Sequence, residues 1–177
     1  MTFFQQNHLD HDAKMIHESN YMTNILPQLA QMNRGAWLYT EMLVECYRET
    51  YPVHVLGGAV WSNDEDAGNS HTPGSLSDMD DWFLTTHDVR TPTHFWKVIQ
   101  LPSDGPFPND GNRIAFWMDN AKDASAKNVG AYVVSLETLA EKLAERGQNE
   151  AFLVAEGELL SHKPEKVWGM PKKCDRS

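Results

Sequence analysis

The chain has 177 residues, 41% of them apolar and 23% charged, which is enough for one compact domain and too few for two. We therefore treat residues 1–177 as a single domain. The formal net charge is −10, from 15 Lys and Arg against 25 Asp and Glu. This balance excludes a protein that holds nucleic acid by a broad basic face, because neutralising phosphates calls for many cations.

Cysteines and targeting signals add few constraints. Cys46 and Cys174 permit at most one disulfide, and the sequence leaves open whether they pair. No basic segment followed by an apolar stretch stands at the N-terminus, so we expect no secretory signal. No apolar run approaches the roughly 18 residues that cross a bilayer, so we expect no membrane span. The sequence does not indicate the cellular compartment of the protein.

The first regular elements are a helix and a strand. Residues from Asn33 to about 50 carry apolar side chains at helical spacings, which predicts a helix with Asn33 as its N-cap. Residues 53–61 are apolar and β-branched, which predicts a strand. A Gly57-Gly58 pair inside that strand indicates a bulge or a close approach of another group to the backbone.

Residues 62–81 are polar and rich in Gly, Ser and Asp, so we expect a surface loop inserted into the domain. Strands are predicted beyond it, at 93–101 and 113–118. The segment between these two strands contains Pro-Asn-Asp-Gly, which is a turn signal.

The last predicted elements are a short strand and a helix. Residues 131–135 form the strand, and Ser135 is the predicted N-cap of a helix over 136–146 that ends at Gly147. The buried stripe of this helix is expected to be Leu136, Leu139 and Leu143. The order of strands and helices indicates an α/β or α+β domain.

Residues 19–37, SNYMTNILPQLAQMNRGAW, carry an unusual number of neutral amides in an otherwise apolar run. One interpretation is structural: Asn20 and Asn24 close turns, and Asn33 caps the helix. The other is that the amides hold a ligand, since buried amides need partners and Asn disfavours helices.

The order of residues in this stretch favours a ligand site. N-x-M-T-N-I-L-P-Q followed by M-N-R-G-A-W resembles the DNA/RNA non-specific endonucleases, the endonuclease G-like ββα-metal or His-Me finger nucleases. VLGGAVW, RTPTHFWKVI, IAFWMDN and YVVSLETLAEKL resemble later elements of that family in the same order, over about residues 7–143. The resemblance implies an α+β fold with a mixed, mostly antiparallel sheet and flanking helices, here an incomplete ββα-metal nuclease fold.

The resemblance also implies a metal site. Asn33 would be the single protein ligand of Mg²⁺, or of Mn²⁺, through its side-chain oxygen at the helix N-terminus. Glu41 would hold a metal-bound water, since on an ideal helix it lies about 80° around the axis from Asn33. A sparse protein site suits Mg²⁺, which keeps several of its waters.

Other residues match positions that orient the site or contact the nucleic acid. Asn24 matches a catalytic amide position, and Gln28 and Asn20 match substrate-binding positions. Arg34, a cation beside the metal ligand, is a further candidate for substrate binding. Neutral amides suit such a site because, unlike carboxylates, they do not repel a polyanion.

The family's general-base histidine lies in a D-R-G-H motif, which this sequence does not contain. Alignment places that histidine at Thr2, so we expect an N-terminally truncated chain. A wrong start site or splice form, a truncated product and an inactive pseudoenzyme stay open as explanations. His8, His11 and His17 follow, and we interpret them as surface or capping residues.

The implied function is metal-dependent, sequence-independent hydrolysis of phosphodiester bonds in DNA and RNA. The alternative is a catalytically inactive nuclease-like domain that binds nucleic acid or a protein partner. A homodimer is a further expectation, through a dimer face of the kind some relatives use.

Few cations are candidates for a local phosphate-binding face. Lys97 is expected at an outward position of its strand, and the others are Arg34, Arg48, Arg90 and Arg113. A set of His and Asp residues lacks metal-ligand spacing and is better explained as loop polar residues; the set is His71, Asp80, Asp81, His87 and His94.

Overall fold

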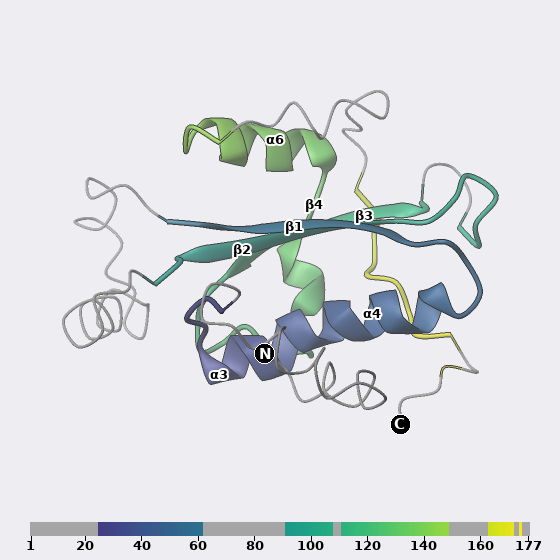
Figure 1. The fold of residues 1–177 in the computed structure, drawn as a ribbon, viewed down its shortest axis with the longest axis horizontal. Coiled ribbons are helices and arrows are strands. Elements are labelled where there is room, and N and C mark those ends of the chain that lie inside the picture. The colour runs from purple at the N-terminus through teal and green to yellow at the C-terminus, as the bar shows by residue number, and fades with distance from the viewer. Residues whose placement is uncertain (1–24, 62–90, 108–110, 149–162, 172–173, 175–177) are drawn as a thin grey trace, which may run out of the picture.

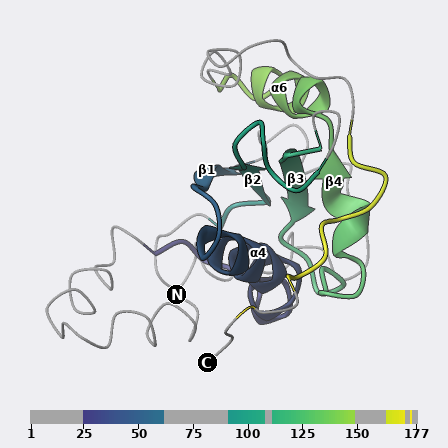
Figure 2. The same ribbon diagram turned by 90° about the vertical axis from the view of Figure 1, so that its right-hand side faces the viewer.

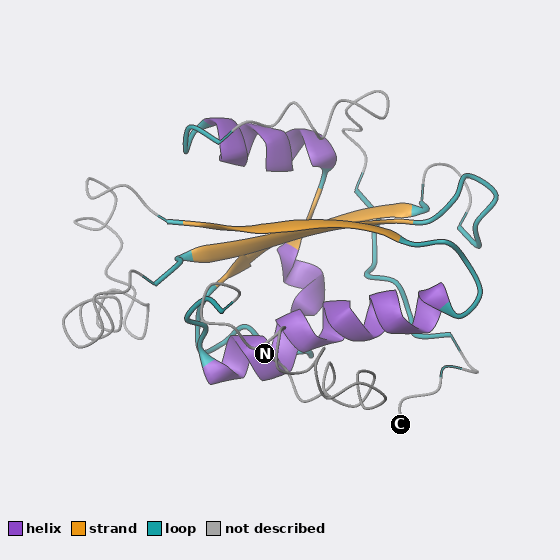
Figure 3. Ribbon diagram, in the orientation of Figure 1, coloured by secondary structure: helices purple, strands orange, loops and turns teal. Residues whose placement is uncertain are grey.

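A four-stranded antiparallel sheet with helices on both faces forms the domain (Figures 1 and 3). The computed structural model describes residues 25–61, 91–107, 111–148, 163–171 and 174. The predicted α+β class is confirmed. The predicted loop insertion at 62–81 lies outside the described residues.

The strands follow one another in the sheet in chain order, β1-β2-β3-β4. They are β1 (His54–Val60), β2 (His94–Gln100), β3 (Arg113–Asp119) and the short β4 (Val133–Val134). The first three predicted strands are therefore confirmed. The fourth is shorter than predicted, because Val129–Tyr132 forms a 3-10 helix before it.

Helices α3 (Ala30–Met32) and α4 (Leu38–Arg48) lie on one face of the sheet, joined by a π-helical turn, Asn33–Trp37. Helix α6 (Leu136–Ala144) covers the other face (Figure 2). No helix among the described residues is long and apolar enough to cross a membrane.

The start of α6 follows the sequence prediction. The Ser135 side chain accepts a hydrogen bond from the Thr138 N–H at 3.0 Å, and Gly147 beyond the helix has a φ of 65°. The predicted leucine stripe is buried, with Leu136, Leu139 and Leu143 at most 5% exposed. Capping and helical periodicity are local signals, which is why the sequence suffices for this element.

The two central strands are buried on both faces. Alternate residues of β2 and β3 face α4, and these are Phe95, Ile99, Ile114, Phe116 and Met118. The intervening residues face α6, and these are Trp96, Val98, Ala115 and Trp117. Each sheet face therefore has its own apolar layer, which fixes the register of the strands.

The Gly-Gly pair of β1 allows a close approach and forms no bulge. Pairing with β2 runs without interruption, with Gly57 opposite Lys97 and Gly58 opposite Trp96. A Cβ atom built on Gly58 would lie 2.7 Å from the indole nitrogen of Trp96. Glycine is thus needed at this position so that the indole can pack against the strand.

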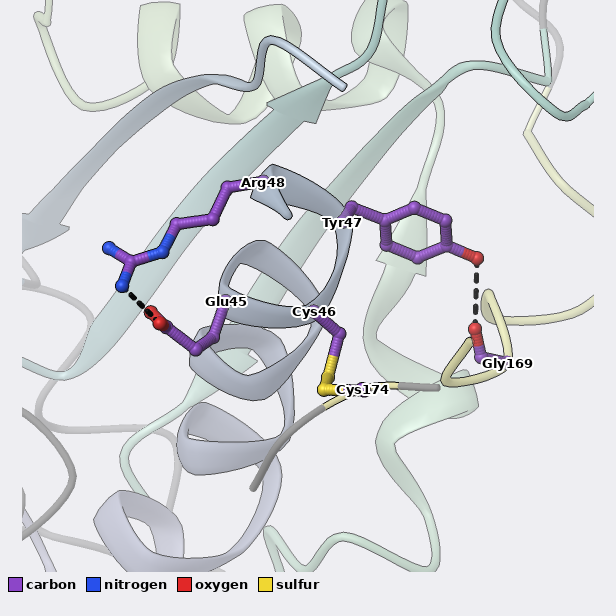
Figure 4. Close-up of a disulfide and its surroundings, with 6 residues drawn as sticks. All are labelled: Glu45, Cys46, Tyr47, Arg48, Gly169 and Cys174. Atoms are coloured by element: carbon purple, nitrogen blue, oxygen red, sulfur yellow. Dashed lines mark hydrogen bonds and ion pairs between the residues drawn. A yellow bond between two sulfur atoms is a disulfide. The ribbon is translucent and has the colours of Figure 1, made fainter. Parts of the chain in front are cut away.

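A disulfide between Cys46 and Cys174 joins α4 to the C-terminal segment (Figure 4). The sequence had left this pairing open. Two tyrosine hydroxyls of α4 bind the same segment: Tyr39 donates to the Trp168 carbonyl at 3.0 Å and Tyr47 to the Gly169 carbonyl at 2.9 Å.

Trp168 completes this attachment. Its side chain is 3% exposed, stacks on Phe107 at 4.8 Å between ring centroids, and meets the Tyr47 ring edge-on. Its indole N–H donates to the Gly111 carbonyl at 3.0 Å. The C-terminal segment therefore joins α4 to the β2–β3 connection.

We expect reduction of the disulfide to lower the free energy of unfolding by about 2 to 5 kcal/mol, because the bond closes a long loop in the unfolded chain. The sequence separation of 128 between the two cysteines places the effect toward the upper part of this range. Denaturant unfolding with and without a thiol reductant measures it. A Cys46→Ser/Cys174→Ser variant should not respond to reductant. Equal midpoints for the oxidised and reduced wild type would contradict the prediction.

Candidate active site

Four of the six residues predicted for the site lie in the described chain, between residues 28 and 41. Asn33 and Gln28 are in direct contact, because the Asn33 side-chain N–H₂ donates a hydrogen bond to the Gln28 Oε1. Asn20 and Asn24 lie outside the described residues. The structure thus brings together one amide pair of the predicted cluster.

Asn33 does not cap the helix, and the predicted N-cap role is wrong. The helix begins at Ala30 after an extended Leu29, and Asn33 has helical φ and ψ of −57° and −48°. Its backbone N–H donates to the Leu29 carbonyl at 2.9 Å. Because Asn33 lies one turn inside the helix, its side chain is not committed to satisfying the first backbone N–H groups.

The turn after Asn33 is kinked. Within residues 33–37, two helical segments meet at Gly35, whose φ and ψ of −109° and −106° are not helical. The angle of about 80° between Asn33 and Glu41 assumed an ideal α-helix and does not apply across this kink. The cause of the kink is local, since glycine tolerates backbone angles that other residues avoid.

Gly35 allows this turn to pack against the loop after β3. A Cβ atom at position 35 would lie 2.6 Å from the carbonyl oxygen of Ala124 and 2.9 Å from the Cα of Ser125. The next residue, Ala36, donates its N–H to that same carbonyl at 3.2 Å. Any larger residue at position 35 would push the helix away from the loop.

Asn120 fixes the segment that precedes the helix. This side chain is fully buried, and its Oδ1 accepts the Leu29 N–H at 2.8 Å. Its Nδ2 donates to the carbonyls of Pro92 at 2.9 Å and Pro27 at 3.3 Å. Asn120 therefore holds both residues that flank Gln28.

Asn120 was not among the predicted site residues, although it ends the segment IAFWMDN. The available signal was an asparagine directly after an apolar strand. That position is where a side chain can bind the backbone of a neighbouring segment, but the sequence does not show which segment lies there.

Lys97 is buried, and its predicted outward position is wrong. It is 6% exposed and faces α4 from the middle of β2. Its Nζ donates to the Thr40 Oγ1 at 2.9 Å and lies 3.8 Å from the centre of the Trp37 ring. Burial lowers the pKa of Lys97 to about 8, while the negative charge of Glu41 acts to raise it.

The other candidate cations are dispersed. Arg34 is exposed and follows Asn33 directly. Arg48 is half-exposed and pairs with the Glu45 carboxylate on α4, as Figure 4 shows. Arg113 begins β3 and Arg90 lies outside the described residues.

His94 is held by two neighbours and belongs to no metal cluster among the described residues. Its Nδ1 lies 2.9 Å from the Thr93 Oγ1, and its Nε2 lies 3.1 Å from the Asp119 carboxylate. The hydrogen bond from His94 lowers the pKa of Asp119, although burial acts against this effect. The other members of the His and Asp set lie outside the described residues: His71, Asp80, Asp81 and His87.

Comparison with known proteins gives one family. The sequence profile of the DNA/RNA non-specific endonucleases matches residues 6–152. No curated protein matches the chain significantly. The matched range includes every residue of the candidate site.

We expect Asn120→Ala to lower the free energy of unfolding, because the buried Leu29 N–H loses its acceptor. Leaving this buried N–H without an acceptor costs about 1 to 3 kcal/mol. Asn128→Ala is the matched control, since the Asn128 side chain binds residues that are near it in the sequence, namely Asp123, Ser125 and Tyr132. Denaturant unfolding of both variants tests the expectation, and equal stabilities would contradict it.

A second prediction concerns the pH dependence of stability. The pKa of Lys97 falls from an ordinary 10.5 to about 8 on folding. The unfolded chain therefore binds more protons than the folded chain between these values, and stability should rise with pH across that window.

The gain between pH 8 and pH 10.5 should reach about 3 kcal/mol at most. Subtracting the profile of Lys97→Met from that of the wild type removes the contribution of other titrating groups. Parallel profiles for the two proteins would show that the pKa of Lys97 does not change on folding.

Proposed function

This chain belongs to the DNA/RNA non-specific endonuclease family, and from that premise we propose that it hydrolyses phosphodiester bonds of DNA and RNA with a divalent metal ion. The observation that carries the proposal is the family match over residues 6–152. Nucleic acid of either kind is the proposed substrate, bound without sequence preference. A homodimer is also proposed, on the family resemblance alone.

The donor set of the site suits a hard cation such as Mg²⁺ or Mn²⁺. The Asn33 Nδ2 is engaged by Gln28, which orients the amide, and no described residue donates a hydrogen bond to the Asn33 Oδ1. Asn33 would hold the cation through this oxygen. The Glu41 carboxylate, further along the same helix, would accept a hydrogen bond from a water on the cation.

When bound, such a cation withdraws charge from the phosphate that is attacked. The residues of this chain would position that phosphate. Gln28 and Arg34 flank Asn33 in the sequence, and the guanidinium of Arg34 suits a phosphate oxygen. Asn20 and Asn24 are proposed to contribute further amides.

Neutral amides allow a strongly acidic chain to bind a polyanion. With a net charge of −10, the protein would repel a phosphate backbone over most of its surface. Amide groups at the site add no further negative charge. An exposed arginine beside them supplies a local attraction, so binding should weaken as salt rises.

The proposal assigns no general base among these 177 residues. They contain no D-R-G-H string. His94 is engaged by Thr93 and Asp119 and is therefore poorly suited to deprotonate water. The second candidate function is a nuclease-like domain that binds nucleic acid or a protein partner without cleaving it.

Nicking of supercoiled plasmid separates the two functions. An active chain converts the supercoiled form to the open circle in Mg²⁺, stops in EDTA, and loses the activity when Asn33 is replaced by Ala. Removing a catalytic metal ligand or its supporting groups costs about 10-fold to 100-fold or more. Gln31→Ala is the matched control, since Gln31 is an exposed amide on the same helix.

The binding function predicts a different outcome: no nicking, with retention of plasmid in a gel-shift assay that weakens in high salt. A folded chain that neither nicks nor retains DNA or RNA would contradict the proposed substrate.

A further inference from the structure

A lysine ammonium lies inside an apolar layer directly beneath the candidate site. Lys97 occupies the α4-facing side of β2, between Phe95 and Ile99, and is 6% exposed. Moving a charged amine from water into such a layer is costly unless its hydrogen bonds are replaced. Two contacts of the Lys97 ammonium partly replace its interactions with water. Both join it to Trp37, in the turn that carries Asn33.

The first contact is with an aromatic face. The Nζ of Lys97 lies 3.8 Å from the centre of the Trp37 ring, which is within the range of a cation–π interaction. Phe95, on the same strand, meets the Trp37 ring edge-on at 5.6 Å between centroids. The ring of Trp37 is therefore held from the sheet side by a charge and by an aromatic edge.

The second contact reaches the backbone of the same residue. Lys97 donates to the Thr40 Oγ1 at 2.9 Å, and that hydroxyl donates to the Trp37 carbonyl at 2.7 Å. The Lys97 ammonium therefore contacts the Trp37 ring directly and is linked to the Trp37 carbonyl through the Thr40 hydroxyl.

Trp37 is the last residue of the kinked turn that starts at Asn33. Within the same turn, Gly35 and Ala36 pack against the Ala124 carbonyl. The loop after β3 therefore contacts this turn at Gly35 and Ala36, and Lys97 contacts it at Trp37.

We propose that Lys97 is a positioning residue of the nuclease site, which holds Trp37 and thereby sets the orientation of Asn33. The inference rests on the proposed function for its catalytic meaning. The contacts of Lys97 with Trp37 and Thr40 do not depend on that function, and the link from Trp37 to the Asn33 amide is what the proposal adds.

Among the described residues, Glu41 is the charged group that acts on Lys97. Glu41 faces it from α4 and acts to raise its pKa, against the larger effect of burial. The cross-strand neighbours are Gly57 on β1 and Phe116 on β3, which do not titrate. The pKa of about 8 means that the buried charge lowers stability at neutral pH. A residue selected only for packing would be apolar.

The experiment compares Lys97→Met, Lys97→Arg and a matched control, Lys142→Met. Lys142 also lies over a tryptophan, 5.4 Å from the Trp117 ring, but on the α6 face. Three quantities are measured for each protein: the melting temperature, the ¹⁵N side-chain amide resonance of Asn33, and Mn²⁺ affinity. The Asn33 resonance is assigned by its loss in Asn33→Ala.

We expect Lys97→Met to melt at or above the wild-type temperature at pH 7, to shift the Asn33 resonance, and to weaken Mn²⁺ binding by about 10-fold to 100-fold. Lys97→Arg should keep part of the affinity, and Lys142→Met should match the wild type in all three measurements. In the wild type, the Asn33 resonance should move with pH with a midpoint near the Lys97 pKa of about 8.

An Asn33 resonance that is unchanged in Lys97→Met overturns the inference. If Lys97→Met does not fold, the wild-type pH titration decides, and a flat Asn33 resonance between pH 7 and pH 9.5 overturns it, a window chosen around the pKa of about 8. If the resonance responds but no protein binds Mn²⁺ or nicks plasmid, the positioning role holds and the proposed nuclease function fails.

Discussion

The arrangement of this domain depends on how the chain is held where it enters the first helix. Asn120 follows β3 and binds the backbone of Pro27, Leu29 and Pro92, which come from two segments far apart in the sequence. A buried amide with three partners is both satisfied and hard to replace, because any other side chain leaves backbone groups unpaired. Gln28 and Asn33 take their positions from this attachment.

The helix that carries the site is therefore supported along its whole length. Its start is held by Asn120, its kink by Gly35 against the Ala124 carbonyl, and its end by the Cys46 disulfide. A helix held at several points moves little relative to the sheet, which suits the proposed role of the candidate site in placing a phosphate. The oxidised disulfide is the form in which the C-terminal segment reinforces α4.

Lys97 differs from Asn120 and the disulfide, because its burial lowers stability at neutral pH. A buried ammonium with a pKa of about 8 makes the folded chain less stable at neutral pH. Its contacts with Trp37 and Thr40 join β2 to the end of the kinked turn that carries Asn33. Sites of this kind commonly retain interactions that cost stability, since precise placement needs charges and hydrogen bonds inside an apolar layer.

The sequence by itself determined the elements and the family. Helical spacing and the Ser135 cap predicted α6, strand patterns predicted β1 to β3, and the order of motifs predicted a common site for Asn33 and Gln28, whose side chains are in contact. Only the tertiary structure showed where the helix starts, which face of the sheet Lys97 occupies, and which backbone groups Asn120 binds. Because β2 is buried on both faces, its pattern does not alternate and gives no sign of where Lys97 points. The partners of Asn120 and the pairing of Cys46 with Cys174 join residues far apart in the chain, and only the folded arrangement brings them together.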